Sequence, residues 1–289
     1  MPIVRAPAKV NLTLEVLARR PDGFHSLRSF MVPVGLFDWI EFAPSERSSL
    51  HCTDPALADG NLVERALSLA GVSQPLAISI EKMIPVGGGL GGGSSDAAAT
   101  LRAVMDGAFN APPRLDWPAI ARQLGSDVPF FLAGTGALVE GTGERVTPVG
   151  RLPPWWTVIV RPAAAVATAQ AYRLLDEHRE REPAPSRSRA DSRSLAAVDA
   201  LQRGEFATLV DLLDNDFHKP VLGAYPAIAR AHAALLGAGA DRALLSGSGS
   251  CVFSLHPDET SARAIAGRLD GTDCAGQFVA PFYAAPEWR

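Results

Sequence analysis

The fold of this chain is decided by the stretch Pro85-Val86-Gly87-Gly88-Gly89-Leu90-Gly91-Gly92-Gly93-Ser94-Ser95-Asp96. Six of the seven residues from 87 to 93 are glycine, so this backbone can adopt positive φ and approach a ligand closely. Residues 76–80 before it alternate as a strand does, and apolar residues recur at helical spacing from 97 to 108 after it. A glycine loop between a strand and a helix directs unpaired N–H groups and the positive end of the helix dipole at one point. We therefore predict an anion site, and more specifically a phosphate site.

Other interpretations of the loop are weaker. A Walker-type P-loop needs lysine and then serine or threonine after its last glycine, and no lysine stands here. Gly87, Gly89 and Gly92 match the dinucleotide fingerprint formally, but that fold needs a second strand that ends in an acidic residue about 20 residues later. Residues 111–114 (Ala-Pro-Pro-Arg) and another helix follow instead. A flexible linker is not expected between a strand and a capped helix.

Composition restricts the function classes. The 289 residues can bury the core of one or two domains, and the net charge of −4 excludes a general basic field for nucleic acid. The three cysteines have neither metal-ligand spacing nor the pattern of a disulfide framework. Without an 18-residue apolar run or a signal-peptide core, the chain is expected to be cytoplasmic. Only three of its 27 basic residues are lysine, so each lysine is a candidate for a specific role.

The glycine loop resembles the Pro-x-x-x-Gly-Leu-Gly-x-x-Ser-Ser segment of the GHMP kinase superfamily, and two further segments resemble its first and third motifs. The resemblance covers essentially the whole chain. It implies an α+β fold of two domains: an N-terminal ribosomal protein S5 domain 2-like α/β domain that binds ATP, and a C-terminal ferredoxin-like domain. We expect these domains at residues 1–152 and 153–289. ATP and substrate would meet in the cleft between them.

Lys9 interrupts the otherwise small or apolar residues at the start of the stretch Ala6–Leu14. Taken alone, it could be a lysine that snorkels at a strand edge. The segment Pro-Ala-Lys-Val-Asn-Leu-Thr-Leu resembles the first GHMP motif, in which the lysine is catalytic. The resemblance therefore assigns a catalytic role to Lys9 and a substrate contact to Asn11.

Asp127 is a lone carboxylate in the segment Gly125-Ser126-Asp127-Val128-Pro129. Such a residue commonly forms an Asx turn or caps a helical turn. The segment also resembles the family's Gly-x-Asp-Val-Pro-x-Phe, which carries the catalytic aspartate. In that role Asp127 would take the proton of the attacking alcohol, and Lys9 would hold it ionised and offset developing charge.

A Pro-Asp-Gly turn at residues 21–23 presents Phe24 and His25. This could be a hairpin tip with a packed aromatic side chain and a solvated imidazole, or a platform for a base. In the family, Asp-Gly-Tyr-His at this place holds cytosine; Phe24 in place of tyrosine keeps the stacking surface and loses the hydroxyl.

Two further segments are candidate substrate contacts. Thr168 is predicted to cap the helix that begins near it. Ser246, Gly247, Ser248 and Gly249 form a turn between two strands, which could be a plain hairpin and which resembles the third GHMP motif.

The resemblance implies transfer of the ATP γ-phosphoryl group to the 2-hydroxyl of 4-diphosphocytidyl-2-C-methyl-D-erythritol, in non-mevalonate isoprenoid precursor biosynthesis. ATP is the expected co-substrate and Mg²⁺ the expected metal. Other GHMP kinases use a serine of the glycine motif as a metal ligand, and two extra residues here leave open whether it corresponds to Ser94 or Ser95. The alternatives are a GHMP kinase for another small alcohol, such as homoserine or a mevalonate derivative, and a non-catalytic nucleotide-binding relative.

Further partners are predicted from charge and class. The substrate would be a small molecule with a cytidine diphosphate group, with no nucleic acid and no membrane, and the chain would be a monomer or weak homodimer. Acids and arginines nearly balance over residues 177–193, which predicts a mobile surface loop rather than a nucleic-acid arm.

Overall fold

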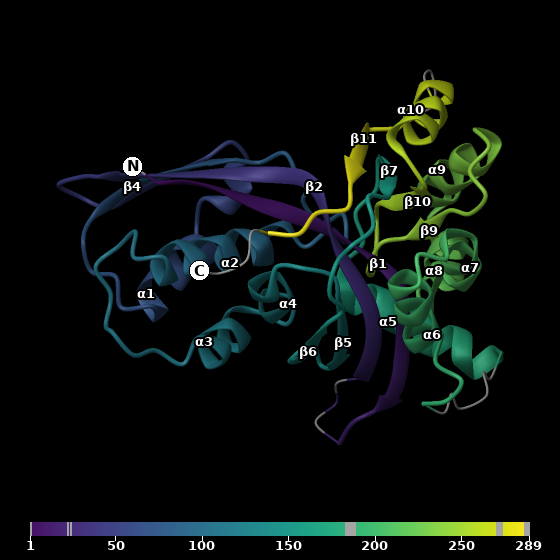
Figure 1. The fold of residues 1–289 in the computed structure, drawn as a ribbon, viewed down its shortest axis with the longest axis horizontal. Helices are drawn as coiled ribbons and strands as arrows, with labels where there is room; N and C mark the ends of the chain where they lie inside the picture. The colour runs from purple at the N-terminus through teal and green to yellow at the C-terminus, as the bar shows by residue number, and fades with distance from the viewer. Residues whose placement is uncertain (1, 22, 24, 183–188, 270–273, 286–289) are drawn as a thin grey trace.

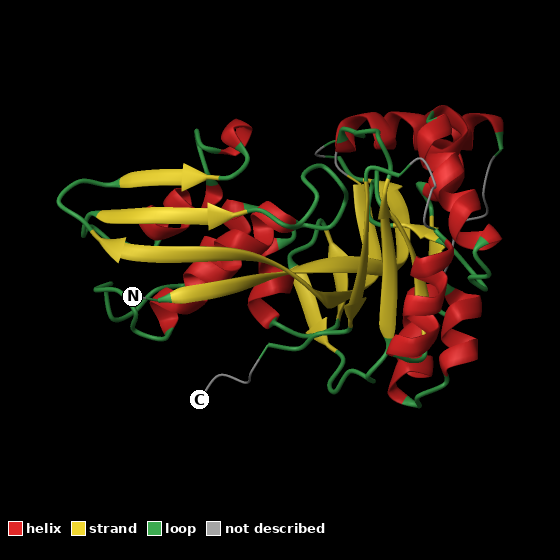
Figure 2. Ribbon diagram, turned by 90° about the horizontal axis from the view of Figure 1, so that it is seen from above, coloured by secondary structure: helices red, strands yellow, loops and turns green. Residues whose placement is uncertain are grey.

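The computed structural model describes residues 2–21, 23, 25–182, 189–269 and 274–285. The described residues form two parts, each with a sheet and covering helices (Figures 1 and 2). The first sheet runs in the order β3-β4-β2-β1-β8, with β5 paired to β2 and β6 paired to β5. Its strands are β1 (Ile3–Arg19), β2 (His25–Pro44), β3 (Ser49–Cys52), β4 (Leu76–Glu81), β5 (Ala137–Gly141), β6 (Arg145–Pro148) and β8 (Asp214–Asn215).

The second sheet is antiparallel and runs in the order β11-β7-β10-β9. In chain order these are its fourth, first, third and second strands, which is the order of a ferredoxin-like sheet. The expected C-terminal fold is therefore confirmed, whereas the domain boundaries remain a prediction. The strands are β7 (Trp156–Arg161), β9 (Leu244–Leu245), β10 (Val252–His256) and β11 (Gly276–Pro281).

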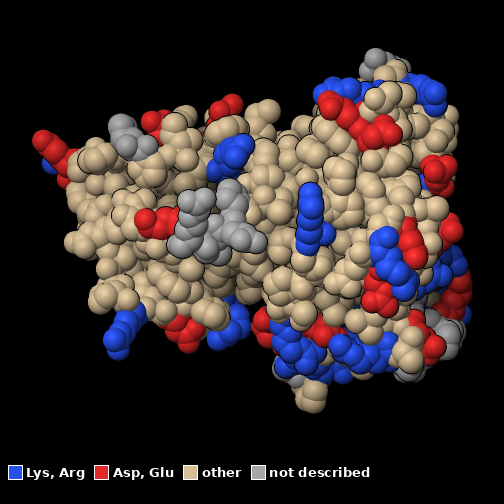
Figure 3. All heavy atoms as spheres, viewed as in Figure 1, with Lys and Arg blue, Asp and Glu red and all other residues tan. Residues whose placement is uncertain are grey.

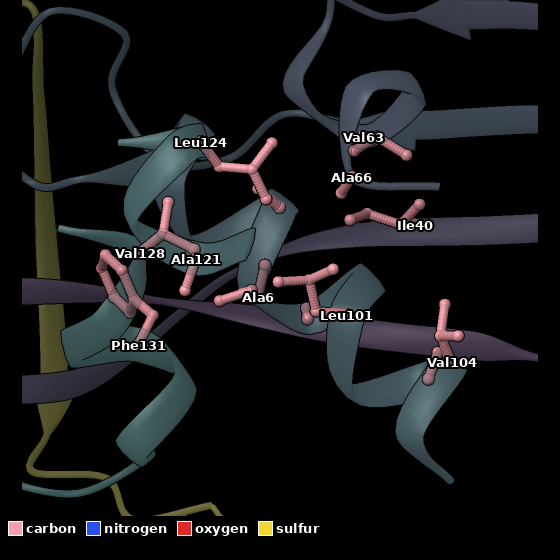
Figure 4. Packing of buried hydrophobic residues seen from close by; sticks show 14 of the residues in the cluster. Ala6, Ile40, Val63, Ala66, Leu101, Val104, Ala121, Leu124, Val128 and Phe131 are labelled. Carbon is pink, nitrogen blue, oxygen red and sulfur yellow. The ribbon is translucent and has the colours of Figure 1, made fainter. Parts of the chain in front are cut away.

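Helices α1 to α4 cover one face of the first sheet (Figure 1). Helix α6 packs on β1, β2 and β5 of the same sheet, and α9 and α10 pack on the second sheet. Figure 4 shows how side chains of α1 to α4 pack onto Ala6 and Ile40 of the first sheet. Among the described residues no helix could cross a bilayer. The helices are α1 (Leu62–Leu69), α2 (Gly92–Met105), α3 (Trp117–Leu124), α4 (Val128–Ala133), α5 (Thr168–Arg181), α6 (Arg193–Gln202), α7 (Phe206–Leu212), α8 (His218–Ala224), α9 (Pro226–Gly237) and α10 (Glu259–Arg268), with a 3₁₀ turn at Pro55–Leu57.

Strand β1 joins the two parts. The pattern of residues 3–17 favours a pair of strands, but they form one strand of 17 residues with irregular register after Pro7, Asn11 and Val16. Even-numbered side chains along it enter all three buried clusters: Ala6 the first, residues 8–12 the second, and residues 14–16 the third. A continuous buried face thus replaces the expected break, and it places Lys9 and Asn11 together on the opposite face.

The segment 177–193 differs from its prediction as a loop. Helix α5 continues to Arg181, and basic residues in its last turn complement the negative end of the helix dipole. Residues 183–188 lie outside the described part of the chain. Basic and acidic residues are interspersed over this half of the molecule (Figure 3), and Arg173 forms an i,i+4 pair with Glu177. Helix α8 was not anticipated from the sequence.

The glycine loop is locked into a second loop, residues 246–251, that comes from the C-terminal half. Ser250 and Cys251 donate their backbone N–H groups to the carbonyl oxygens of Gly87 and Gly88, at 3.3 and 3.0 Å. The hydroxyl of Ser246 donates to the carbonyl of Gly89 at 3.0 Å. Gly89 has φ +74°, and a Cβ there would lie 2.0 Å from the Ser246 carbonyl oxygen. Only glycine permits this approach.

The two ends of the glycine loop are joined by a buried group of three charges. Lys82, just before the loop, donates to Asp38 of β2 at 2.5 Å and to Asp96 in α2 at 2.6 Å. Asp38 also accepts the backbone N–H groups of Met83 and Ile84. Burial raises the pKa of the Asp96 carboxyl to about 7, with Lys82 opposing the rise and Asp38 adding to it. The single charge of Lys82 offsets one carboxylate, and the raised pKa means that Asp96 holds its proton up to a pH of about 7.

Replacement of Gly89 by alanine tests the contact between the loops. Gly89→Ala should lower the free energy of unfolding by roughly 3 kcal/mol or more, because left-handed strain adds to a clash with backbone. Gly87→Ala is the matched control: its φ is +69°, but a Cβ there meets nothing within 4 Å. It should cost only the strain, about 1–2 kcal/mol, in chemical denaturation. Equal losses for the two variants would contradict the interlocked arrangement.

Asp96→Asn tests the buried charge group through pH. A carboxyl with a raised pKa holds its proton more tightly in the folded chain, so wild-type stability should fall as pH rises from about 4 to 7. An asparagine does not titrate, so the variant should gain stability relative to wild type by roughly 1–3 kcal/mol between pH 5 and pH 8. Denaturant titrations at both pH values measure this gain, with Asp116→Asn at the exposed cap of α3 as the control. A pH-independent difference would show that Asp96 does not hold a proton.

Candidate active site

Lys9 is buried on β1 at the base of the cleft, with 4% of its surface exposed. Its ammonium donates to the side-chain oxygen of Asn11 at 2.6 Å, and the Asn11 amide donates to the Ser29 hydroxyl at 2.8 Å. Its backbone N–H donates to the carbonyl of Leu90 at 3.0 Å, which fastens the glycine loop to β1. Burial lowers the pKa of Lys9, and the nearby Asp127 partly offsets this effect. These contacts hold the ammonium at one place in the cleft.

Asp127 lies at the start of α4, and its Oδ2 is 4.0 Å from Nζ of Lys9. It stands at the N-cap position, yet its side chain makes no capping hydrogen bond. Its side chain is 35% exposed, against 5% for Lys9. The carboxylate therefore does not serve the ordinary capping role, and it faces both the ammonium and the cleft.

A cavity of about 440 Å³ opens at this pair. Lys9, Asn11 and Asp127 line it, together with predicted contacts from both halves: Pro85, Val86, Gly87, Gly88, Gly89, Leu90, Gly91, Gly92, Gly93, Ser94, Thr168, Gly247, Ser248 and Gly249. Segments far apart in sequence thus meet here, as the GHMP resemblance implies.

Three of the predicted residues do not line the cavity directly. Ser246 is fully buried and holds Gly89 through its hydroxyl. Ser95 is 1% exposed and donates its hydroxyl to the carbonyl of Pro7 at 2.6 Å, whereas Ser94 lines the cavity. His25 stacks on Tyr172, which lines the cavity, and Phe24 lies outside the described residues.

The N-terminus of α2 faces the same cavity. Gly91 occupies the N-cap position at φ +74°, and no side chain caps the helix. A Cβ at Gly91 would lie 2.7 Å from the Phe131 ring, so this turn also needs glycine. The first N–H groups of a 14-residue helix thus lack a side-chain partner and point toward the cleft, which is the arrangement that binds phosphate.

Thr168 was expected to cap α5, but the cap position belongs to Ala167 and Thr168 is the first helical residue. Its hydroxyl lies 3.2 Å from that of Ser248, because the helix begins beside the second loop. The prediction of the cap is therefore wrong by one residue. Thr168 nevertheless lines the cavity.

An aromatic group closes one side of the cleft. The rings of His25 and Tyr172 stack at 5.1 Å, and the Tyr172 ring meets Phe217 edge-on at 4.9 Å. Asp176, one turn after Tyr172 on α5, lies 3.4 Å from Nε2 of His25. Burial raises the pKa of Tyr172, and the carboxylates of Asp127 and Asp176 add to this.

Sequence reasoning missed two participants in the cleft. Tyr172 lines the cavity and follows Thr168 by four residues, so helical spacing could have placed both on one face. Lys82 also lines the cavity. It is one of the chain's three lysines, and this scarcity was a signal that could have singled it out.

Metal ligands are sparse in the described part of the chain. No group of three or more histidine, cysteine, aspartate or glutamate side chains there is arranged to hold a metal ion. The cleft offers Asp127 and hydroxyl groups to a cation. A divalent cation at this place would therefore take most of its ligands from phosphate groups, as Mg²⁺ commonly does.

Comparisons with known proteins agree with this geometry. Residues 61–135 match the family described as GHMP kinases N terminal domain, and residues 197–273 match GHMP kinases C terminal. The 4-diphosphocytidyl-2-C-methyl-D-erythritol kinase of Symbiobacterium thermophilum is 40% identical over 92% of this chain and 93% of its own length. The enzyme of that name from Deinococcus radiodurans is 39% identical over 95% and 90%.

Solved structures lead to the same family. A crystal structure of 4-(cytidine 5'-diphospho)-2C-methyl-D-erythritol kinase matches with a TM-score of 0.80 and 36% identity, over 98% of this chain and 100% of that one. The mevalonate kinase of L. major matches with a TM-score of 0.69 over 99% and 97%, but at 14% identity it supports the fold alone. The chain belongs to the 4-diphosphocytidyl-2-C-methyl-D-erythritol kinases, within the GHMP kinase family.

Proposed function

We propose that this chain transfers the γ-phosphoryl group of ATP to the 2-hydroxyl of 4-diphosphocytidyl-2-C-methyl-D-erythritol, which gives ADP and the 2-phosphate. The observation that carries the proposal is the pair formed by Lys9 and Asp127, 4.0 Å apart, beside the glycine loop in a chain of this family. The reaction supplies an isoprenoid precursor by the non-mevalonate route.

The triphosphate would lie on the glycine loop and the uncapped N-terminus of α2. Positive φ at Gly87, Gly89 and Gly91 turns the backbone without side chains in the way. The N–H groups of the first turn of α2 and the helix dipole stabilise the phosphate charge. This arrangement supports ATP as the co-substrate.

Asp127 would act as the general base. Phosphoryl transfer needs the attacking hydroxyl to lose its proton as the new P–O bond forms and the bond to ADP breaks. In the proposed reaction that proton passes to the Asp127 carboxylate. Lys9, fixed by Asn11, would hold the charge of Asp127 and stabilise the charge that develops on the transferred oxygens.

Mg²⁺ is proposed as the metal that accompanies ATP. Phosphate oxygens would supply most of its ligands, and Asp127 is a carboxylate that lines the same cavity. When bound, the ion neutralises phosphate charge and aligns the transferred group.

The cytidine end of the substrate would lie at the aromatic side of the cleft. His25 is the first residue of β2; its ring stacks on Tyr172, and its Nε2 lies 3.4 Å from Asp176. An aromatic surface with fixed polar groups suits a nucleobase, which offers a π face and hydrogen-bonding edges. The roles of Phe24 and His25 toward cytosine are part of the proposal.

The reaction can be tested directly by coupled measurement of ADP release with ATP and Mg²⁺. We expect turnover with 4-diphosphocytidyl-2-C-methyl-D-erythritol and none above background with the 4-phosphate that lacks cytidine. Turnover of homoserine or of a mevalonate derivative instead would move the substrate to another alcohol. ATP binding without any ADP release would indicate a non-catalytic relative.

Asp127→Asn tests the base. The variant should lose at least about 10²-fold in kcat, the lower range for a missing general base, because an amide cannot accept the proton. Its melting temperature should fall by only a few degrees, because Lys9 loses a carboxylate neighbour but keeps its hydrogen bond to Asn11, and the Asp127 side chain caps no helix. Asp116→Asn, at a cap remote from the cavity, serves as the control with normal kcat. Near-normal turnover of Asp127→Asn would remove Asp127 from the mechanism.

A further inference from the structure

A short segment, Asn215 and Asp216, lies between α7 and α8 and has no role in the proposed chemistry. Asn215 belongs to the two-residue strand β8, which pairs in parallel with β1 at Thr13 and Leu14. The segment is therefore placed directly against the strand that carries Lys9. Both of its side chains form hydrogen bonds with backbone groups of other segments.

Asn215 is 3% exposed and uses its amide group in three directions. Its Nδ2 donates to the carbonyl oxygens of Leu245 and Gly247, both at 2.8 Å. Its Oδ1 accepts the backbone N–H of Phe217 at 2.9 Å. A primary amide has two N–H groups that diverge, so one side chain can hold two carbonyls of a turn.

The turn that Asn215 holds touches the predicted catalytic lysine. Gly247, at φ +55°, lies so close that a Cβ there would be 3.1 Å from Nζ of Lys9 and 3.4 Å from Oδ1 of Asn11. On its other side the same turn holds the glycine loop, through Ser246 and Gly89. A shift of this turn would therefore move the surroundings of the Lys9 ammonium.

Asp216 anchors the segment at its other end. Its Oδ2 accepts the backbone N–H of Val16 at 2.8 Å and an N–H of Arg179 at 2.9 Å. Arg179 also donates to the Val16 carbonyl at 2.7 Å. Because Arg179 lies on α5, the segment is tied to β1 and to the helix that carries Thr168 and Tyr172. The backbone beside Asn215 is therefore fixed to β1 and α5 while its side chain binds the turn.

We propose that Asn215 is a positioning residue, which holds the Ser246–Gly249 turn against Lys9 and so keeps the ammonium in place beside Asp127. The inference deepens the proposed kinase function and relies on it for any effect on turnover. Asn215 touches neither Lys9 nor the cavity itself. Its influence is carried by the two carbonyl groups that it binds.

Asn215→Asp is the test variant. The carboxylate has the same shape and still accepts the Phe217 N–H, but it cannot donate to Leu245 and Gly247 and it repels their carbonyl oxygens. We expect kcat to fall at least about 10-fold while the KM values for ATP and for the alcohol change less than about threefold, because Asn215 binds the part of the turn that lies beside Lys9.

Thr157→Val is the matched control. It removes one buried hydrogen bond, from the Thr157 hydroxyl to the Ala280 carbonyl at 2.9 Å, within the C-terminal sheet and away from the cavity. Both variants should lower the melting temperature, since each removes a buried hydrogen bond. Only Asn215→Asp should lower kcat. If Asn215→Asp does not fold, Asn215→Ala makes the same comparison without a buried charge.

A second measurement does not depend on turnover. The chain has three lysines, so NMR of isotope-labelled lysine side chains gives three signals that single substitutions can assign. The Lys9 signal should shift in Asn215→Asp and keep its position in Thr157→Val, while the Lys219 signal stays unchanged in both. A shifted Lys9 signal would support the positioning role even if the wild-type enzyme did not phosphorylate the proposed alcohol. An unmoved Lys9 signal with unchanged kcat in a folded variant would overturn it.

Discussion

The approach of two glycine-containing loops determines how this molecule is organised. At Gly89 the backbone comes so near Ser246 that no side chain fits between them, and the amides of Ser250 and Cys251 bond to the glycine loop itself. One loop follows a strand of the first sheet and the other belongs to the second sheet. The phosphate-binding backbone is therefore shaped by both halves of the chain, and a contact made of backbone tolerates little displacement.

Two groups of charged side chains lie beside this contact. Lys82, between Asp38 and Asp96, neutralises the base of the glycine loop, and Lys9, near Asp127, stands at its open side. A buried lysine is unfavourable without partners, and each of these has both a carboxylate and a fixed acceptor or second carboxylate. Both lysines are buried and both line the cavity, but Asp38 and Asp96 are buried whereas the Asp127 side chain is 35% exposed. The exposure of the carboxylate partner therefore separates the structural group from the proposed catalytic one.

Much of the site could be predicted because its signals are local. Six glycines in seven residues predict a close backbone approach, Asp116 predicts the start of α3, and the two strands around residues 246–249 form the expected turn. Contacts between distant residues gave no such signal: Asp38, Lys82 and Asp96 lie 44 and 14 residues apart, and nothing in the pattern of any one segment joins them. The sequence pattern predicted a pair of strands within residues 3–17 because alternation is a local property, whereas the continuity of β1 comes from the three separate clusters that it enters. The ferredoxin-like strand order was expected from the family resemblance alone.

Native-state hydrogen exchange of the Ser250 and Cys251 amides tests the central claim most directly, since these two groups donate across the contact between the loops. If the interlocked loops form part of the cooperative structure, both amides should exchange only through global unfolding, with the same free energy of opening as the central amides of β1. Exchange through a local opening, many times faster than that of β1, would contradict the account. It would mean that the two halves shape the phosphate loop only when a ligand is bound.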